Sequence, residues 1–217
     1  MKDSYLVPAR DGEAEIEVRN SRFLCTIRRV ASEEAAREVV AQMRHQHWDA
    51  RHHCSAFVVG PQADLQRSSD DGEPAGTAGA PMLEVLRGAE LSDVVAVVTR
   101  WFGGTLLGAG GLVRAYSDSV REAVAVVGTR RRVLVEEHRV LLEHAVAAKA
   151  EAQIRAAGVD VLDVRWAEQH VEVLLGARPS AADVVAQVVA RATHGSSSSS
   201  VVGSRWIDTD EGASTSL

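Results

Sequence analysis

Lysine is almost missing from this sequence of 217 residues. Lys2 and Lys149 are its only lysines, so 22 of the 24 basic residues are arginines. The formal net charge of −6 disfavours a protein that coats nucleic acids through a general basic surface. A local basic patch stays open, because the planar arginine fork suits phosphate groups and aromatic rings. Codon bias in a GC-rich genome is the alternative explanation for the arginines.

Cysteines and long apolar runs are also scarce. Cys25 and Cys54 are the only cysteines, which is too few for a disulfide framework and favours a reducing compartment. No apolar run approaches the roughly 20 residues that a membrane-spanning helix needs. Residues 1–10 contain neither the apolar stretch nor the cleavage site of a secretory signal. We therefore expect a cytoplasmic protein without membrane attachment.

The first half of the chain alternates between strand and helix patterns. The hydrophobic share of 46% allows a buried core, and the length suits two domains. Ser32 is placed to cap a helix. Residues 94–99 are almost entirely apolar and β-branched, which predicts a central strand buried on both faces. The other expected elements are extended chain over 14–30, a strand over 52–59, a long loop over 60–79, a short helix over 81–86, a glycine-rich loop over 102–111 and a long helix after it, with Val113 on its buried stripe.

The second half of the chain has the element order of a known fold. Residues 129–132 combine a break signal with three arginines, and we predict the hinge between two separate cores there. Ser180 and Asp183 have the spacing of a capping box. The expected order is strand 133–142, helix 144–157, strand 159–166, strand 170–175, helix 180–193 and strand 201–207, a ferredoxin-like βαββαβ unit. The predicted domains are therefore 1–129 and 130–208, with a disordered tail over 209–217.

One segment that could carry chemistry lies within the long loop, over residues 67–79. Its candidate residues are Arg67, Ser68, Ser69, Asp70, Asp71, Glu73 and Thr77. Three carboxylates within four residues repel one another unless a divalent cation, an arginine or solvent compensates. A metal held by the three carboxylates is one interpretation, and a solvated turn is the other. Thr77 stands at a helix start, where backbone N–H groups could receive an anion.

The other segment runs from Arg100 to Arg114. Five glycines lie within nine residues between a buried strand and a helix: Gly103, Gly104, Gly108, Gly110 and Gly111. Such glycines let backbone amides approach a ligand, or let a tight loop pack against neighbouring backbone. The spacing fits neither a Walker loop nor a dinucleotide fingerprint. We predict that both segments meet on one face, where helix N-termini near Thr77 and Gly111 favour an anion.

The run His52-His53-Cys54 is a third candidate. On a strand, His52 and Cys54 project to one face and His53 to the other. A Cys–His nucleophile pair or half of a metal site would need this arrangement. A buried cysteine beside polar histidines is the simpler interpretation.

The three motifs at 67–79, 95–104 and 107–116 together closely resemble the Impact family in its bacterial, YigZ-like form. Residues 21–24 and 52–54 match the same pattern, so the resemblance covers nearly the whole chain. It implies an α+β protein with a ribosomal-protein-S5-domain-2-like first half. The second half would then be similar to the last domain of elongation factor G. Ala75 and Trp101 stand where we would expect serine and tyrosine, and neither change removes a charge or a glycine.

The resemblance also implies a function. Eukaryotic relatives act in translation control under stress, and the likeness to ribosomal and elongation-factor domains suggests that this chain binds RNA or the translation machinery. We expect a binding and regulatory protein without a cofactor. The alternative is a phosphate-handling enzyme, kinase-like or a hydrolase, that uses the glycine-rich loop and the acidic cluster.

Overall fold

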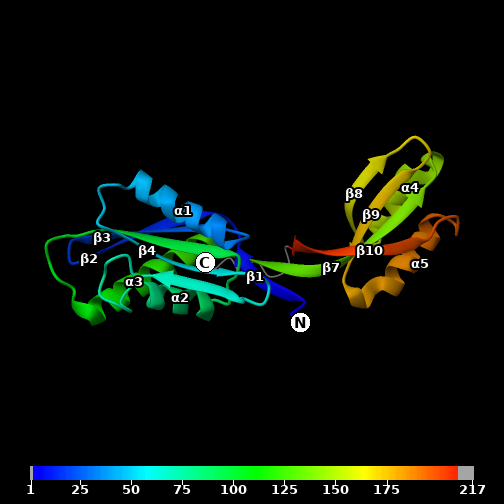
Figure 1. Cartoon of the computed structure of the whole chain (residues 1–217). Helices are drawn as coiled ribbons and strands as arrows, with labels where there is room; N and C mark the ends of the chain where they lie inside the picture. Colours follow the sequence, from blue (N-terminus) through cyan, green and yellow to red (C-terminus); the bar gives the residue numbers. More distant parts are fainter. Residues whose placement is uncertain (1, 210–217) are drawn as a thin grey trace. The chain divides into compact units, whose positions relative to one another are not determined.

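The computed structural model describes residues 2–209, which form two compact units. Unit 1 contains the chain up to Arg132 together with Asp208 and Thr209, and unit 2 contains Val133–Ile207. Both units mix helices and strands (Figure 1). None of the helices in this range is long and apolar enough to cross a membrane.

Unit 1 is built on a five-stranded antiparallel sheet. The sheet has the order β2-β3-β6-β4-β5. The elements of unit 1 are β1 (Ser4–Pro8), β2 (Gly12–Val18), β3 (Ser21–Arg29), α1 (Glu33–Gln46), β4 (His52–Val59), β5 (Leu65–Ser69), α2 (Gly79–Gly88), β6 (Val94–Trp101) and α3 (Gly108–Val127). Helix α1 covers one face of this sheet, and α2 and α3 cover the other (Figure 1).

The central strand β6 supplies both cores of unit 1. Val94, Ala96 and Val98 pack in the core beneath α2 and α3. Val95 and Val97 pack in the core beneath α1. Successive side chains of a strand point to opposite faces, so an unbroken run of valines fills both layers at once. The prediction of a central strand buried on both faces is confirmed.

Two helix predictions in unit 1 have different outcomes. The Ser32 hydroxyl accepts the backbone N–H of Ala35 at 3.2 Å and caps α1, as predicted. Helix α3 begins at Gly108, so three glycines assigned to the loop lie in its first turn. Val113 was expected on the buried stripe of α3 but is 39% exposed, because Leu112 takes the inward position.

Unit 2 has the element order βαββαβ that the sequence predicts. Its elements are β7 (Thr129–Leu142), α4 (His144–Ala156), β8 (Asp160–Trp166), β9 (Val171–Ala177), a short 3-10 turn (Pro179–Ala181), α5 (Ala182–Ala192) and β10 (Ser199–Thr209). Strand β7 pairs with β9 and β10, and β9 pairs with β8. Both helices bury small apolar residues against the sheet. The assignment of the two units to S5-like and ferredoxin-like folds stays a prediction.

Some boundaries differ from the expectations. Strands β1 and β5, each five residues long, were not predicted. Helix α5 begins after Ala181, which gives no side-chain cap, so the capping box at Ser180 and Asp183 is wrong. Residues 129–132, predicted as the hinge, form the first part of β7, and the two compact units divide directly after them; the hinge itself stays a prediction. Thr209 ends β10 and is not part of a tail, while residues 210–217 of the predicted tail lie outside the described residues.

Candidate functional site

The register of the central strands sets Arg100 and His52 side by side. His52 of β4 is the direct partner of Arg100 of β6, and Phe23 of β3 is its partner on the other side. Directly opposite residues share a face of the sheet. Phe23 is buried in the core beneath α2 and α3. Arg100 and His52 therefore lie at the end of that core.

Asp70 fastens the loop before α2 to the start of that helix. Its carboxylate accepts backbone N–H groups from Gly76 at 2.8 Å, Ala78 at 3.0 Å and Gly79 at 2.8 Å. Burial by itself raises the pKa of Asp70, but the three donors together lower it below the ordinary value. The positive end of α2 is thus occupied by a carboxylate of the chain itself.

Asp71 connects the same loop to α1 and β4. Its carboxylate pairs with Arg44 and accepts the backbone N–H of His53 at 2.6 Å. Its carbonyl lies 2.9 Å from Nδ1 of His52. A carbonyl oxygen only accepts, so this nitrogen carries the proton, and the neutral ring has its lone pair on Nε2. Burial lowers the pKa of His53, which keeps that ring neutral at pH 7.

Glu73 joins the two segments that were predicted to meet. Its Oε1 accepts from Nη1 of Arg100 at 2.5 Å and from the hydroxyl of Tyr116, in α3, at 2.8 Å. The side chains of Arg100 and Glu73 are 6% and 4% exposed. This is a buried ion pair, so the small stability effect that an exposed Arg100 would have does not apply here.

The three carboxylates do not form a metal site. Asp70 is held by backbone amides, Asp71 by Arg44 and Glu73 by Arg100. Across residues 2–209 no cluster of histidine, cysteine, aspartate and glutamate side chains could hold a metal ion. The repulsion expected from their spacing is relieved because the three side chains find separate partners.

Four further candidates of this segment lie away from Arg100. Arg67, Ser68 and Ser69 belong to the edge strand β5 and line a shallow cavity beside α1. Thr77 is buried, and its hydroxyl donates to the carbonyl of Pro74 at 2.6 Å. Arg67 therefore does not join Arg100 and Arg114, and Thr77 holds the loop rather than a ligand.

The glycines of the second segment have different roles. A Cβ on Gly103 would come within 2.0 Å of the carbonyl oxygen of Asn20, so only glycine fits beneath the turn between β2 and β3. Gly104 and Gly108 have φ angles of +84° and +73°, which favour glycine. A Cβ on Gly110 would meet nothing within 4 Å, although one on Gly111 would lie 3.0 Å from Leu107. Packing thus explains Gly103, while the start of α3 remains accessible.

A cavity of about 390 Å³ lies where these pieces converge. We call it the α3 cavity. Arg100, His52 and Glu73 contribute to it from the sheet and the preceding loop, and Gly108 and Ala109 contribute from α3. The remaining lining residues are Arg51, Pro74, Phe102, Leu106, Leu107 and Leu112. Arg114 is exposed on α3 and does not line it.

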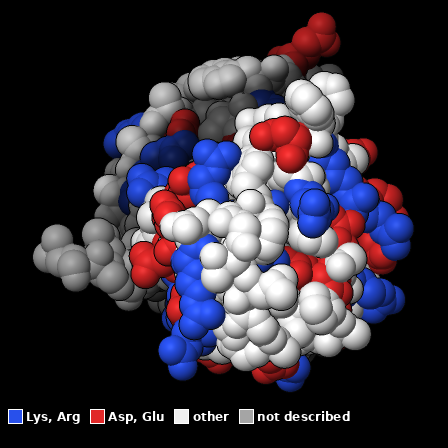
Figure 2. Space-filling model, turned by 90° about the vertical axis from the view of Figure 1, so that its left-hand side faces the viewer, with Lys and Arg blue, Asp and Glu red and all other residues white. Residues whose placement is uncertain are grey.

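Two residues that line the cavity, Leu106 and Phe102, have exposed apolar side chains, and Trp48 is exposed outside the lining. Trp48 is 83% exposed, Leu106 82% and Phe102 42%. Arg22 stacks over the ring of Trp101 at 3.9 Å, and Arg51 lies 6.0 Å from the ring of Phe102. Figure 2, which views unit 1 from this side, shows a broad uncharged area with basic and acidic residues around it.

We call this surface the aromatic end of unit 1. It is defined by Trp48, Trp101, Phe102 and Leu106 with Arg22 and Arg51, and we include the exposed Arg114 because it lies on α3, whose first residues line the cavity. Trp48 belongs to it because its neighbours contact Trp101: the indole N–H of Trp101 donates to Asp49 at 2.9 Å, and the His47 ring packs edge-on against the Trp101 ring.

Cys54 is not placed to act as a nucleophile. It shares the inner face with His52, as the strand period predicts, but its thiol is fully buried. The thiol donates to the carbonyl of Asp70 at 3.0 Å and lies 3.3 Å from the hydroxyl of Tyr116. Burial raises the pKa of Cys54 to about 12, so the thiol stays protonated near neutral pH.

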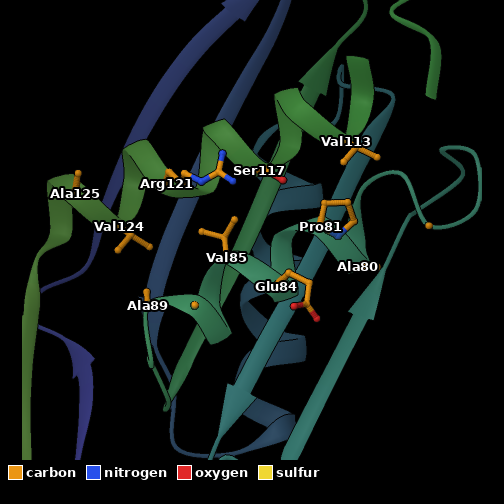
Figure 3. A pocket seen from close by; sticks show the side chains of 12 residues that line it. Ala80, Pro81, Glu84, Val85, Ala89, Val113, Ser117, Arg121, Val124 and Ala125 are labelled. Atoms are coloured by element: carbon orange, nitrogen blue, oxygen red, sulfur yellow. The ribbon is translucent and has the colours of Figure 1, made fainter. Parts of the chain in front are cut away.

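A second cavity, of about 830 Å³, separates α2 from α3 (Figure 3). Small apolar side chains such as Val85 and Val124 line it. Glu84 and Arg121 stand at its edge, and each is paired within its own helix, with Arg87 and Asp118. None of the residues predicted for the site lines this groove.

Comparison with known proteins assigns the chain to a family. Residues 19–124 match the Impact N-terminal domain. YvyE of Bacillus subtilis, an IMPACT family member, is 42% identical over 168 residues, which is 77% of each chain. The chain belongs to the IMPACT family. YigZ of Escherichia coli, another member, is 43% identical over 144 residues, 65% of this chain and 71% of its own.

Two solved structures were also compared with the chain. The crystal structure of a hypothetical protein covers 93% of this chain and 98% of its own at 33% identity, with a TM-score of 0.63. This similarity supports a two-domain fold of mixed helices and strands. The two-domain translational regulator Yih1 is 26% identical, covering 59% of this chain and 48% of its own, with a TM-score of only 0.36.

Sequence reasoning missed part of this IMPACT surface. Trp48, Leu106, Phe102 and Arg51 were not among the candidates, although all lie within the matched domain. Large apolar residues in the turn-rich segments 47–51 and 102–107 were the available signal, since such segments rarely bury their side chains.

Proposed function

We propose that this IMPACT family member is a binding protein that regulates translation by contacting RNA of the translation machinery through its aromatic end. The observation that carries the proposal is the combination of exposed rings with arginines at one end of unit 1. Single-stranded RNA is held by stacking of bases on aromatic side chains and by arginines that follow the backbone.

The exposed apolar side chains need an explanation of their own. Trp48 and Leu106 are both more than four-fifths exposed. A group of such residues in one place is typical of an interaction surface. Phe102 and Trp101 add flat rings, and each has an arginine nearby. Base stacking uses these features without requiring a particular base.

Arginines of this surface are available to a phosphate backbone. Arg51 and Arg114 have no acidic partner among residues 2–209, and Arg22 has only a distant contact of 3.7 Å with Glu15. Acidic residues nearby would oppose RNA binding if they were free. Asp70, Asp71 and Glu73 are instead neutralised within the protein. The acidic cluster is therefore compatible with an RNA-binding surface.

A regulatory role fits the family. Yih1 is described as a translational regulator, and eukaryotic relatives are expected to act in translation control. The two candidates for chemistry lose support in the described residues: the Cys54 thiol stays protonated, and the carboxylates of Asp70, Asp71 and Glu73 find separate partners. Binding through the aromatic end, rather than catalysis, is the function that we propose.

The test measures binding of the full chain to fluorescently labelled single-stranded RNA and to purified ribosomes over a range of salt. The variant Arg22→Ala/Arg114→Ala removes two exposed arginines of the aromatic end. Its RNA affinity should fall about tenfold or more, and its salt slope should drop by about 1.4, since each phosphate contact on a single strand contributes about 0.7.

Arg155→Ala is the matched control. Arg155 is an exposed arginine in unit 2 and pairs with Glu151 on its own helix. Its removal should change neither the affinity nor the salt slope. Equal binding by the double variant and the parent protein at every salt concentration would show that the aromatic end is not the RNA-binding surface.

A further inference from the structure

The α3 cavity has features that the proposed RNA surface does not require. Its volume of about 390 Å³ lies in the range of small-molecule sites. One wall is apolar, with Phe102, Leu106 and Leu112. The Phe102 ring is 42% exposed, and the guanidinium carbons of Arg51 and Arg100 lie 6.0 and 5.7 Å from its centroid. The shape and lining suit a planar group.

Arg100 contributes hydrogen-bond donors to the same cavity. Arg100 lines it with a side chain that is only 6% exposed. Its Nη1 pairs with Glu73 and its Nη2 lies 3.4 Å from the hydroxyl of Ser21. Its Nε has no hydrogen-bond partner within the described part of the chain. A buried N–H without a partner is rare, and a bound water or ligand atom at this end of the cavity would account for it.

The first turn of α3 adds a second group of donors. Leu107 precedes the helix and provides no side-chain cap. At α2 the corresponding amides are bound by Asp70, but α3 has no such carboxylate among the described residues. A Cβ on Gly108 or Gly110 would meet nothing within 4 Å, so a ligand atom can come close to the backbone. A phosphate group fits such a helix start.

His52 and Arg51 complete the lining. Nδ1 of His52 is bonded to the carbonyl of Asp71, so the neutral ring has its acceptor on Nε2. Arg51 has no acidic partner in the described range and lies beside the Phe102 ring. The cavity thus combines an aromatic face, a cation, an open helix start and an acceptor, which together match a base, a phosphate and a ribose hydroxyl.

We propose that the α3 cavity binds one unpaired nucleotide of an RNA strand, with its base against Phe102 and its phosphate at the first turn of α3 beside Arg51. This inference rests on the proposed function, because it makes RNA the source of the nucleotide. A free mononucleotide has the same chemistry, and the experiment separates the two sources.

The probes are AMP, GMP, CMP and UMP, adenosine as the ligand without phosphate, and a hexanucleotide with a 5′-phosphate. Titrations use the full chain with Phe102→Ala, Arg51→Ala and Gly110→Ala. Phe102→Ala should weaken nucleotide and hexanucleotide binding about five- to a hundredfold, as expected for loss of one stacked base. Arg51→Ala should weaken AMP about tenfold and leave the weaker binding of adenosine unchanged.

Gly110→Ala is a control for a change in the first turn of α3. Alanine favours a helix over glycine, so this variant should be at least as stable as the parent protein. Gly110 does not line the cavity, so this variant should bind AMP as the parent does. Val124→Ala, in the groove between α2 and α3, is the second control and should also bind AMP as the parent does.

The outcomes distinguish this inference from the proposed function. If no mononucleotide binds, while Arg22→Ala/Arg114→Ala still weakens RNA binding, the cavity inference is wrong and the RNA surface stands. If AMP binds and is lost in Phe102→Ala but no RNA binds, RNA is not the source and the proposed function is wrong. Loss of both ligands in Phe102→Ala and Arg51→Ala supports both.

Discussion

Arg100 and Arg114 bracket the same loop in the sequence, and the structure gives them opposite surroundings. Arg100→Ala removes one partner of a buried ion pair and leaves Glu73 at 4% exposure with the Tyr116 hydroxyl as its donor. Breaking such a pair costs about 3–5 kcal/mol. Arg114 is exposed, and its replacement by alanine should change the free energy of unfolding by less than about 0.5 kcal/mol.

The assay is urea unfolding at pH 7, in a background where Trp166 and Trp206 of unit 2 are replaced by phenylalanine. Fluorescence then reports on Trp48 and Trp101, which lie in unit 1. The double variant Arg100→Met/Glu73→Gln replaces both charges by neutral groups and should recover more than half of the loss.

Equal losses for Arg100→Ala and Arg114→Ala would refute this reasoning. So would a loss below about 1 kcal/mol for Arg100→Ala, because it would mean that the pair is exchanged for water without cost. If Arg100→Ala is destabilised and the double variant is not rescued, packing of the arginine stem rather than its charge maintains the core.

Three further predictions concern the same unit. Asp70→Asn should lower the free energy of unfolding by about 1–3 kcal/mol at pH 7. Because the pKa of Asp70 is lowered in the folded state, this difference is present above the ordinary aspartate pKa and should vanish as the pH falls through the pKa of the folded state. Unfolding measured over a range of acidic pH would show this. Native Cys54 should resist a thiol reagent at pH 8 and react quickly in urea; fast labelling of the folded chain would contradict its pKa of about 12. Gly103→Ala should lower the free energy of unfolding by about 1–3 kcal/mol, because its methyl group would overlap the Asn20 carbonyl. The melting temperature should fall with it, and an unchanged melting curve would argue against that close contact.

Strong local patterns in the sequence predicted most elements. The run Val94–Thr99 and the cap at Ser32 were sufficient to place β6 and α1. Strand β5, with the sequence LQRSS, has no apolar alternation, because it is an exposed edge strand. Its pairing with β4 comes from tertiary contacts that a local pattern does not record.

The candidate site was predictable in position but not in detail. Both glycine- and charge-rich segments were correctly singled out as neighbours, since Glu73 contacts Arg100. Their chemistry depends on where each side chain points. Asp70, Asp71 and Glu73 are close in sequence, yet their carboxylates have separate partners. Composition also cannot show which arginine is buried. The exposure of Trp48 became visible only with the surface.

The two-sided burial of β6 restricts how this domain can change in length. Its alternation directs Arg100 to the cavity side and Trp101 to the side of α1, where Asp49 binds the indole. One inserted residue between Val94 and Thr99 would move the side chains that follow it to the opposite face of the sheet. Arg100 and Trp101 would exchange faces, and both cores would lose their packing. Insertions and deletions can therefore be accommodated in the segment 102–107 but not in the strand that precedes it. The face of the sheet on which Arg100 and Trp101 lie is fixed by the number of residues in that one strand.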